Sequence, residues 1–273
     1  MSHTHEPAKN PARAAVVTGA TSGIGRATAL ELARRGWRVY AVGRRAERLE
    51  TLAADARAEG VSGDVVPAAL DVTDEAAVAA LASRVEADGG ADTLVNIAGG
   101  ALGTDAVGVG DRADWEWMYR VNVLGTLTMC QAFLPMLRAH GEGTVLNLTS
   151  TAAVTAYEGG AGYNAAKMGQ HGLTGALRLE EAEHNVRVIE VLPGMVHTEE
   201  FSRNRLGGDQ SAADAVYAGV EKPLTAEDVA EFPELFGAIG EAYFNGRMFE
   251  DALAIYHQMS DNEEVRSLRR SES

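Results

Sequence analysis

The chain has 273 residues, of which 46% are hydrophobic and 23% are charged, a balance typical of a globular protein with one substantial α/β core. Its formal net charge of −15 repels phosphate backbones, and no apolar run approaches the roughly 20 residues that cross a membrane, so we expect neither nucleic acid nor membrane as a partner. The single cysteine, Cys130, excludes an internal disulfide and favours a reducing cytoplasm as the location.

The first elements of the chain indicate a phosphate-binding turn. Residues 1–12 lack an apolar core, so we expect a disordered tail there rather than a secretory signal. A buried strand at 14–18 then runs into a glycine-rich turn at 19–25 and an amphipathic helix at 26–35. The turn has the spacing G-x-x-x-G-x-G, which lets the backbone approach a pyrophosphate while N–H groups at the helix start point towards it. The alternative is a tight turn that binds no ligand.

The end of the second strand bears on the choice of dinucleotide. This strand, at 38–42, runs into Gly43, Arg44 and Arg45 before a helix at 46–59. In dinucleotide-binding folds an acidic residue here binds the 2′-hydroxyl of NAD, whereas an arginine accommodates the 2′-phosphate of NADP. A guanidinium also binds phosphate well in the bidentate mode. We therefore expect NADP, with NAD less favoured; the alternative is a solvated basic helix start, where cations would oppose the helix dipole.

Two further strands complete the pattern that indicates the fold. A strand at 65–70 ends in Asp71 and Val72, and a strand at 93–96 leads into a glycine pair. Four strands therefore alternate with helices in about the first hundred residues, the signature of a parallel, doubly wound sheet of the Rossmann type with three α/β/α layers. We expect residues 13–230 to form one dinucleotide-binding and catalytic domain.

The helix that carries Tyr163 and Lys167 is the most informative stretch for chemistry. Two residues four apart lie on one face of a helix, one turn from each other. An ammonium near a phenol stabilises the phenolate and lowers the phenol pKa from about 10, which suits a group that gives and takes protons. Ser150, at the end of a strand at 143–149, could supply a hydroxyl to the same reacting oxygen. The pattern Y-x-x-x-K alone is weak, because many surface helices contain it by chance.

Three more segments carry candidate functional residues. A long helix predicted at 114–139 contains Asn122 among apolar neighbours, where an amide is usually a satisfied hydrogen-bonding group of the core. A sixth strand at 186–192 is followed by a loop with His197, and a lone histidine in a loop is more often solvated than catalytic. Residues 199–222 are polar and irregular, as expected of a lid over a substrate pocket.

The end of the chain departs from the pattern of the first two hundred residues. No convincing strand occurs between 231 and 259, and we expect an atypical helical extension over 231–273. Its apolar residues are spaced like a single tetratricopeptide repeat: Ile239, Gly240, Ala242, Tyr243, Phe249, Ala252 and Tyr256. One such repeat cannot bury its own apolar face. Two readings stay open, a helix pair that closes the fold and an interaction module.

The residues after each strand resemble the cofactor site of the short-chain dehydrogenase/reductase family over residues 14–229. The turn at 18–25 is similar to the family motif T-G-x-x-x-G-x-G, and 96–99 is similar to N-N-A-G, with Ile97 in place of the second asparagine. The resemblance implies the following cofactor-binding residues, in addition to the catalytic tyrosine and lysine: Thr18, Gly19, Thr21, Ser22, Gly23, Ile24, Gly25, Gly43, Arg44, Arg45, Asp71, Val72, Asn96, Ala98, Gly99, Pro193, Gly194, Val196 and Thr198.

Four residues fall in the order and spacing of the catalytic tetrad of that family. The resemblance implies that Tyr163 exchanges a proton with the reacting oxygen while a hydride passes to or from NADP(H). It implies that Lys167 lowers the tyrosine pKa and binds the nicotinamide ribose, and that Ser150 donates a hydrogen bond to the substrate oxygen. Asn122 would hold a water of the proton relay. Because members of the family often pair through their long helices, a homodimer or homotetramer is expected.

These observations together predict an NADP-dependent oxidoreductase that interconverts a carbonyl and a secondary alcohol on a small molecule, without a metal. The segments 198–202 and 224–229 look like the subgroup that acts on 3-hydroxy acids, while a reductase of bulkier ketones stays open. The alternative to an enzyme is a nucleotide-binding scaffold or regulatory protein that acts through its helical tail.

Overall fold

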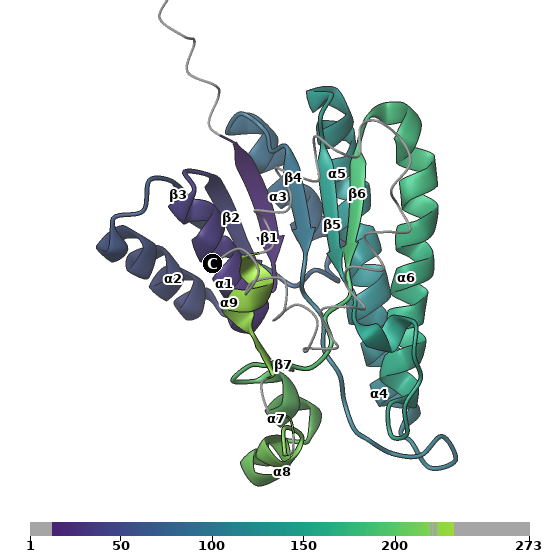
Figure 1. The fold of residues 1–273 in the computed structure, drawn as a ribbon. Helices are drawn as coiled ribbons and strands as arrows, with labels where there is room; N and C mark the ends of the chain where they lie inside the picture. Colours follow the sequence, from purple (N-terminus) through teal and green to yellow (C-terminus); the bar gives the residue numbers. More distant parts are fainter. Residues whose placement is uncertain (1–12, 219, 221–222, 232–273) are drawn as a thin grey trace, which may run out of the picture. The chain divides into compact units, whose positions relative to one another are not determined.

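Six parallel strands form the central sheet, in the order β3-β2-β1-β4-β5-β6 (Figure 1). The fold is taken from a computed structural model, which describes residues 13–218, 220 and 223–231. The strands are β1 Ala14–Thr18, β2 Arg38–Gly43, β3 Asp64–Ala69, β4 Thr93–Asn96, β5 Thr144–Leu148 and β6 Arg187–Val191. The predicted parallel, doubly wound sheet is therefore confirmed, and each predicted strand end lies within one residue of the observed one.

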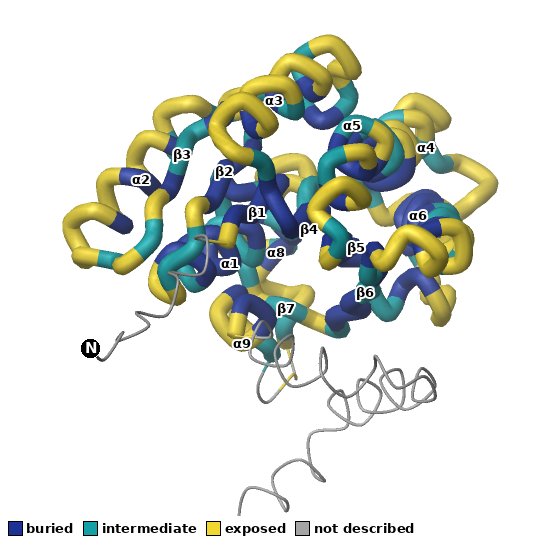
Figure 2. Tube along the Cα trace, turned by 90° about the horizontal axis from the view of Figure 1, so that it is seen from above, coloured by how far each residue is buried: buried dark blue, intermediate teal, exposed yellow. Residues whose placement is uncertain are grey.

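Helices cover both faces of the sheet, as the crossover connections of parallel strands require. Figure 2 shows α1 and α9 (Ala226–Ala230) below the sheet and α3 and α5 (Gly125–His140) above it. Four helices connect or follow the strands of the sheet: α1 Gly23–Arg34, α2 Ala46–Glu59, α3 Glu75–Ala87 and α6 Ala161–Glu181. Two short 3₁₀ turns, η2 Thr151–Ala153 and η3 Ala182–His184, lie on either side of α6. Because both faces are covered, β1 and β5 are buried along their whole length.

The main hydrophobic core fills the space between the sheet and the helices α3 and α5. Strand residues such as Val16, Tyr40 and Leu94 meet Val78 of α3 and Phe133 of α5, and each of these side chains is at most 1% exposed. Within β2, Tyr40 and Val42 both belong to this core, because every second side chain of a strand points to the same face of the sheet. This core fixes the plane of the sheet and so the positions of the loops at its carboxyl edge.

The helical run at 112–140 differs from the single helix that the sequence predicts. It consists of α4 Arg112–Tyr119, a π-helical turn η1 Arg120–Leu124, and α5 Gly125–His140. The run begins at Arg112 because Asp111 caps it, accepting a hydrogen bond from the Ala113 N–H. A π turn inserts one extra residue per turn, and such turns are frequent at functional sites. Hydrophobic periodicity does not reveal this local widening.

Beyond β6 the chain leaves the sheet, as predicted, and then forms short regular elements. A two-residue strand β7 Val196–His197 pairs with β8 Leu224–Thr225, and between them lie α7 Phe201–Arg205 and α8 Gln210–Ala215. The expectation of an irregular segment at 199–222 is thus wrong in part, because two helices form within it.

Local capping explains where the short helices of this segment begin. Asp209 caps α8 by accepting from the Ala212 N–H. A capping box begins α9 Ala226–Ala230, since Thr225 and Asp228 hydrogen-bond each other's backbone N–H.

The expectations for residues 1–12 and for 232–273, including the tetratricopeptide-like spacing, lie outside the described residues. None of the helices within the described ranges is long and apolar enough to cross a membrane.

Candidate active site

The site lies where the carboxyl ends of the central strands meet, the usual position of ligand sites in open α/β sheets. The glycine-rich turn follows β1, Asn96 ends β4, Ser150 follows β5, and Pro193 follows β6. The backbone ties two of these loops together, because Thr151 N–H donates to the Pro193 carbonyl at 3.1 Å. Helix α6 then brings Tyr163 and Lys167 to the same edge.

The glycine-rich turn has the form of a phosphate cradle. Gly19 and Gly23 have φ angles of +71° and +50°, which other residues rarely adopt, and a Cβ at Gly25 would lie 2.3 Å from the Gly19 carbonyl oxygen. Helix α1 begins at Gly23 without a side-chain hydrogen bond from Ser22 and without an acidic residue in its first turn. Its first N–H groups therefore have no side-chain cap, which fits an anion. Thr198 reaches the turn as well, because its Cγ2 lies 3.3 Å from the position of a Cβ at Gly23.

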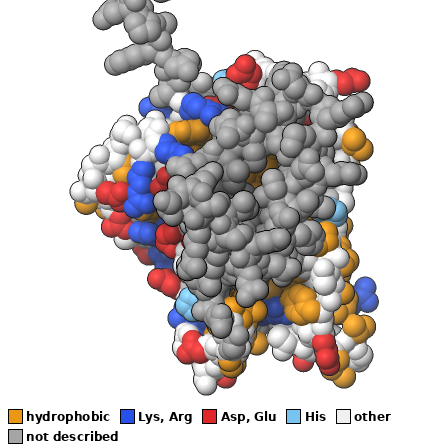
Figure 3. All heavy atoms as spheres, in the orientation of Figure 1, with side chains coloured by type: hydrophobic (Ala, Val, Ile, Leu, Met, Phe, Trp, Pro, Cys, Tyr) orange, Lys and Arg blue, Asp and Glu red, His pale blue; other side chains and the backbone are white. Residues whose placement is uncertain are grey.

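The two arginines after β2 have different surroundings. The Arg44 side chain is 67% exposed and lies 4.0 Å from an Asp71 carboxylate oxygen. Arg45 is held more firmly, since its Nη2 donates to the hydroxyls of Thr21 at 2.7 Å and Ser22 at 3.1 Å. A guanidinium pair beside an uncapped helix start fits the 2′-phosphate end of NADP(H). Figure 3 shows basic and acidic side chains mixed along this edge, over α2.

Thr18 and Asn96 organise the backbone between β1 and β4. The Thr18 hydroxyl accepts hydrogen bonds from the Ile97 and Ala98 N–H groups, both at 2.9 Å. These bonds use backbone atoms, so the turn forms although Ile97 replaces an asparagine of the family motif. Asn96 Nδ2 donates to Asn147 Oδ1 at 2.9 Å, while the buried Asn96 Oδ1 has no hydrogen-bond partner among the described residues. Asn147 is a polar residue inside an apolar strand, and its part in the site was not predicted from the sequence.

Tyr163, Lys167 and Ser150 lie together under the loops at this edge. Tyr163 and Lys167 are 8% and 4% exposed, and the Lys167 Nζ lies 5.9 Å from the centre of the Tyr163 ring. Ser150 Oγ accepts from the Ala152 N–H at 3.1 Å, and its hydrogen bond to Tyr163 favours the phenolate. Neither reactive side chain therefore points into solvent.

The protonation of the pair differs from the sequence-based expectation. Burial raises the pKa of Tyr163 well above its ordinary value; the Ser150 hydrogen bond opposes this, the nearby Tyr157 adds to it, and the Arg205 charge opposes it. Burial also lowers the pKa of Lys167 to about 7, although the Glu190 carboxylate acts in the opposite direction. The pKa of Tyr163 is thus raised rather than lowered, because desolvation outweighs the Ser150 hydrogen bond and the Arg205 charge. Lys167 is not among the groups that shift it, so the expected effect of Lys167 on the tyrosine stays a prediction.

A buried hydrogen-bond chain explains where the Lys167 ammonium is held. Its Nζ donates to the Leu148 carbonyl at 3.1 Å and to Gln170 Oε1 at 2.7 Å. Gln170 Nε2 donates to the Thr126 hydroxyl at 3.0 Å, which donates to the Asn122 backbone carbonyl at 2.8 Å. Gln170 and Thr126 were not identified from the sequence. Gln170 lies three residues after Lys167 on the same helix, and that spacing was the available signal.

Asn122 itself is a fully hydrogen-bonded group in the π turn. Its Nδ2 donates to the carbonyls of Gly100 at 2.9 Å and Met118 at 2.8 Å, and its Oδ1 accepts from the Gly100 N–H at 3.3 Å. A Cβ at Gly99 would lie 2.4 Å from Asn122 Oδ1 and 3.6 Å from Lys167 Nζ. Asn122 therefore shapes the loop after β4 right beside the lysine.

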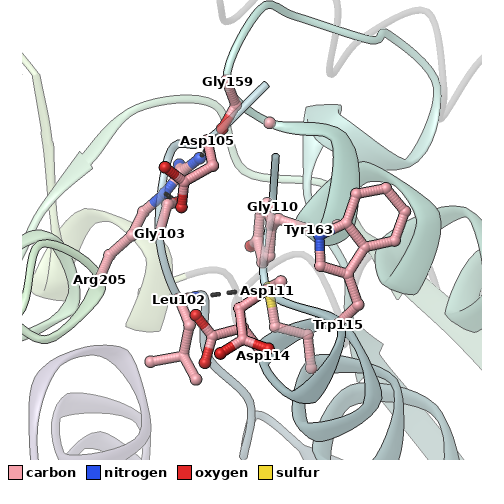
Figure 4. A pocket seen from close by; sticks show the side chains of 13 residues that line it. Leu102, Gly103, Asp105, Gly110, Asp111, Asp114, Trp115, Gly159, Tyr163 and Arg205 are labelled. Atoms are coloured by element: carbon pink, nitrogen blue, oxygen red, sulfur yellow. Dashed lines mark hydrogen bonds between the residues drawn. The ribbon is translucent and has the colours of Figure 1, made fainter. Parts of the chain in front are cut away.

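A pocket opens above Tyr163 (Figure 4). It is a shallow pocket that is open to solvent, and its wall includes Asp105, Asp114, Trp115 and Arg205. The Arg205 guanidinium carbon lies 5.8 Å from the centre of the Tyr163 ring. The pocket thus combines a proton-carrying phenol, carboxylates and one cation.

His197, considered from the sequence as an acid or base, lies elsewhere. It is exposed, and its ring packs edge-on against Tyr217 with the ring centres 4.5 Å apart. A histidine that does touch a buried acid is His171, whose Nδ1 lies 2.9 Å from Glu190. Within the described residues no group of three or more His, Cys, Asp or Glu is placed to hold a metal ion.

Comparison with known proteins gives a consistent result. Residues 13–207 match the family described as short chain dehydrogenase. The chain is 50% identical over 219 residues to an uncharacterized oxidoreductase of Mycobacterium tuberculosis, covering 80% of this chain and 82% of the relative. It is 42% identical over 216 residues to serine 3-dehydrogenase of Agrobacterium fabrum, covering 79% and 84%. The closed form of a serine dehydrogenase complexed with NADP+ superimposes with a TM-score of 0.74 at 36% identity, covering 80% and 86%.

Proposed function

This chain belongs to the short-chain dehydrogenase/reductase family, and from that premise we propose that it is an NADP(H)-dependent oxidoreductase that interconverts a 3-hydroxy acid and the corresponding carbonyl compound. The observation that carries the proposal is that Tyr163 and Lys167 are buried close to each other at the edge of the sheet that also carries the glycine-rich turn, and that Tyr163 lines a pocket. The relatives support the cofactor and the CH–OH chemistry, since one of them acts at carbon 3 of serine and a related structure holds NADP+.

The residues of the chain divide the work of the reaction. NADP(H), when bound, supplies or accepts the hydride. Tyr163 donates its proton to the carbonyl oxygen during reduction, and its raised pKa keeps the phenol protonated for that direction at neutral pH. Ser150 donates a hydrogen bond to the same oxygen and stabilises the charge that develops there. Lys167 and Asn122 hold the loops beside the reacting groups in place, and Gln170 keeps the lysine in position.

Arg205 is placed to bind the acid group of the substrate. Its Nε, Nη1 and Nη2 donate to the Gly103 carbonyl at 3.1 Å, the Tyr157 hydroxyl at 2.8 Å and the Gly159 carbonyl at 3.0 Å. A guanidinium has five N–H donors, so these three hydrogen bonds within the described chain fix its position and leave two for a ligand. Because it lies on the wall of the pocket that contains Tyr163, it can anchor a carboxylate while the hydroxyl or carbonyl reaches the phenol.

Turnover of a substrate panel tests this proposal. NADPH oxidation is followed with 3-oxo acids and with neutral ketones of the same length, and NADP+ reduction with 3-hydroxy acids. Tyr163→Phe is expected to lower kcat by about 10²–10⁴-fold while NADPH binding, measured by fluorescence, is unchanged. Tyr119→Phe, at an exposed tyrosine outside the site, is the matched control. Full turnover by the Tyr163→Phe enzyme would show that the Tyr163 phenol is not the proton donor.

We also infer that the chain assembles as a homodimer or homotetramer and works in the cytoplasm. Four large apolar side chains are 40–79% exposed along α4, η1 and α6, namely Tyr119, Leu124, Met168 and Leu179. Such exposure favours a contact with a second copy. Sedimentation of the wild type and of Leu124→Asp tests this, with a smaller species expected for the variant.

A further inference from the structure

Glu200 is a buried carboxylate surrounded by arginines. It is 6% exposed and immediately precedes α7. Its oxygens lie 2.8 Å from Arg45 Nη1, 2.6 Å from Arg48 Nη1 and 3.8 Å from Arg203 Nη2. Burial alone would raise the pKa of Glu200, but hydrogen bonds with Arg45 and Ser22 and the two arginine charges outweigh it and leave the pKa below its ordinary value. Glu200 is therefore an anion at neutral pH.

One of the arginines that hold this anion is also a predicted ligand of the phosphate group. Arg45 belongs to the segment after β2 that faces the 2′-position of a dinucleotide, and its other nitrogen donates to Thr21 and Ser22 of the glycine-rich turn. Carboxylates and phosphates bind a guanidinium in the same bidentate geometry. A protein carboxylate thus already occupies Nη1 of Arg45, a donor that a phosphate could otherwise use, and it comes from a residue 155 positions further along the chain.

Helix α7 connects that carboxylate to the substrate pocket. Phe201, directly after Glu200, packs edge-on against Tyr163 with the ring centres 5.8 Å apart. Arg205, at the other end of the same five-residue helix, holds the pocket wall through Gly103 and Gly159. A change in the contacts of Glu200 can therefore be transmitted through α7 to Phe201 and to Arg205, which lines the pocket.

We propose that Glu200 is a specificity-determining residue that competes with the phosphate group of NADP(H) for Arg45 and Arg48, so that phosphate binding releases α7 from the cradle. The inference rests on the proposed cofactor. The competition brings the affinity for NADP(H) closer to that for NAD(H), because Arg45 must break its ion pair with Glu200 before it can bind the phosphate. It also links the presence of the phosphate to the position of Phe201 and Arg205, and hence to access to the pocket.

Nucleotide binding by calorimetry tests the competition. The probes are 2′,5′-ADP, which carries the 2′-phosphate, and 5′-AMP, which does not. Glu200→Gln, which keeps the shape and removes the charge, is expected to bind 2′,5′-ADP about tenfold more tightly than the wild type, with 5′-AMP changed by less than about twofold. The matched control is Glu199→Gln, which removes the same charge from the exposed neighbouring residue and is expected to leave both affinities unchanged.

Hydrogen exchange of the wild-type protein tests the release of α7 without any substitution. Saturating 2′,5′-ADP is expected to increase amide exchange at 201–205, whereas 5′-AMP is not. Weaker 2′,5′-ADP binding by Glu200→Gln would show that Glu200 supports the phosphate site and would overturn the inference, as would unchanged exchange in α7. Failure of the wild type to bind 2′,5′-ADP would instead overturn the proposed cofactor, and with it this inference.

Discussion

Replacing Lys167 by methionine tests how the buried lysine affects stability. Lys167 is 4% exposed, and the hydrogen bonds of its ammonium go to Leu148 and Gln170. Methionine has a similar length and no charge, so the variant removes the titrating group and keeps most of the packing. The loss of hydrogen bonds is a constant offset in the free energy of unfolding, whereas the titration of the lysine changes with pH.

The magnitude follows from the two pKa values of the lysine. In the folded protein the pKa is lowered from the ordinary 10.5 to about 7. Between these values the unfolded chain binds a proton that the folded chain has released, so stability rises with pH. The full difference corresponds to about 5 kcal/mol of destabilisation below pH 7, which is relieved as the pH rises towards 10.5. Between pH 6 and pH 9 the wild type should gain about 3 kcal/mol from this residue.

Urea unfolding monitored by circular dichroism, at several pH values from 6 to 9, measures this gain. The quantity of interest is the free energy of unfolding of the wild type minus that of Lys167→Met, because titrations shared by both proteins cancel. We expect this difference to rise by about 3 kcal/mol across the range. Met168→Leu, at the exposed next residue, should show a difference that does not change with pH. Parallel curves for the wild type and Lys167→Met would refute the reasoning, since the lysine would then not titrate near neutral pH.

Three more variants test neighbouring parts of the site. Gln170→Leu should destabilise the protein by about 1–3 kcal/mol at pH 6 and less at pH 9 in the same urea series, because the charged lysine loses an acceptor; equal losses at both pH values would contradict this. Arg44→Ala should weaken NADPH binding about tenfold or more and NADH binding little, as measured by calorimetry. Equal losses of affinity for the two dinucleotides would contradict a contact between Arg44 and the 2′-phosphate. Arg205→Met should raise KM for a 3-oxo acid about tenfold or more while KM for a neutral ketone changes little; equal changes would argue against a carboxylate anchor.

The fold follows closely from local sequence patterns. Each predicted strand end lies within one residue of the observed one, because short, mostly buried apolar runs between turn and helix signals are easy to recognise. The caps at Asp74, Asp209 and Thr225 also start helices by local hydrogen bonds. The π turn around Asn122 was not predicted, because the extra residue leaves the apolar pattern of the helix almost unchanged.

The residues at the site are only partly visible in the sequence. Tyr163, Lys167, Ser150 and the glycine-rich turn belong to local motifs whose strands and helices bring them to one edge of the sheet. Gln170 and Asn147 were missed, because a buried amide shows its role through partners that lie on other elements.

The sequence by itself determined the parallel sheet, the turn at the start of α1 and the set of side chains gathered at the carboxyl edge, since these depend on short-range spacing and periodicity. The tertiary structure alone decided the charge states, because it buries Tyr163 and Lys167 and so shifts both towards their neutral forms. It also decided that Arg45 holds Glu200, a residue far along the chain. Desolvation and long-range ion pairs depend on which distant residues surround a group. Local sequence patterns do not show these neighbours, because they come together only when the chain folds.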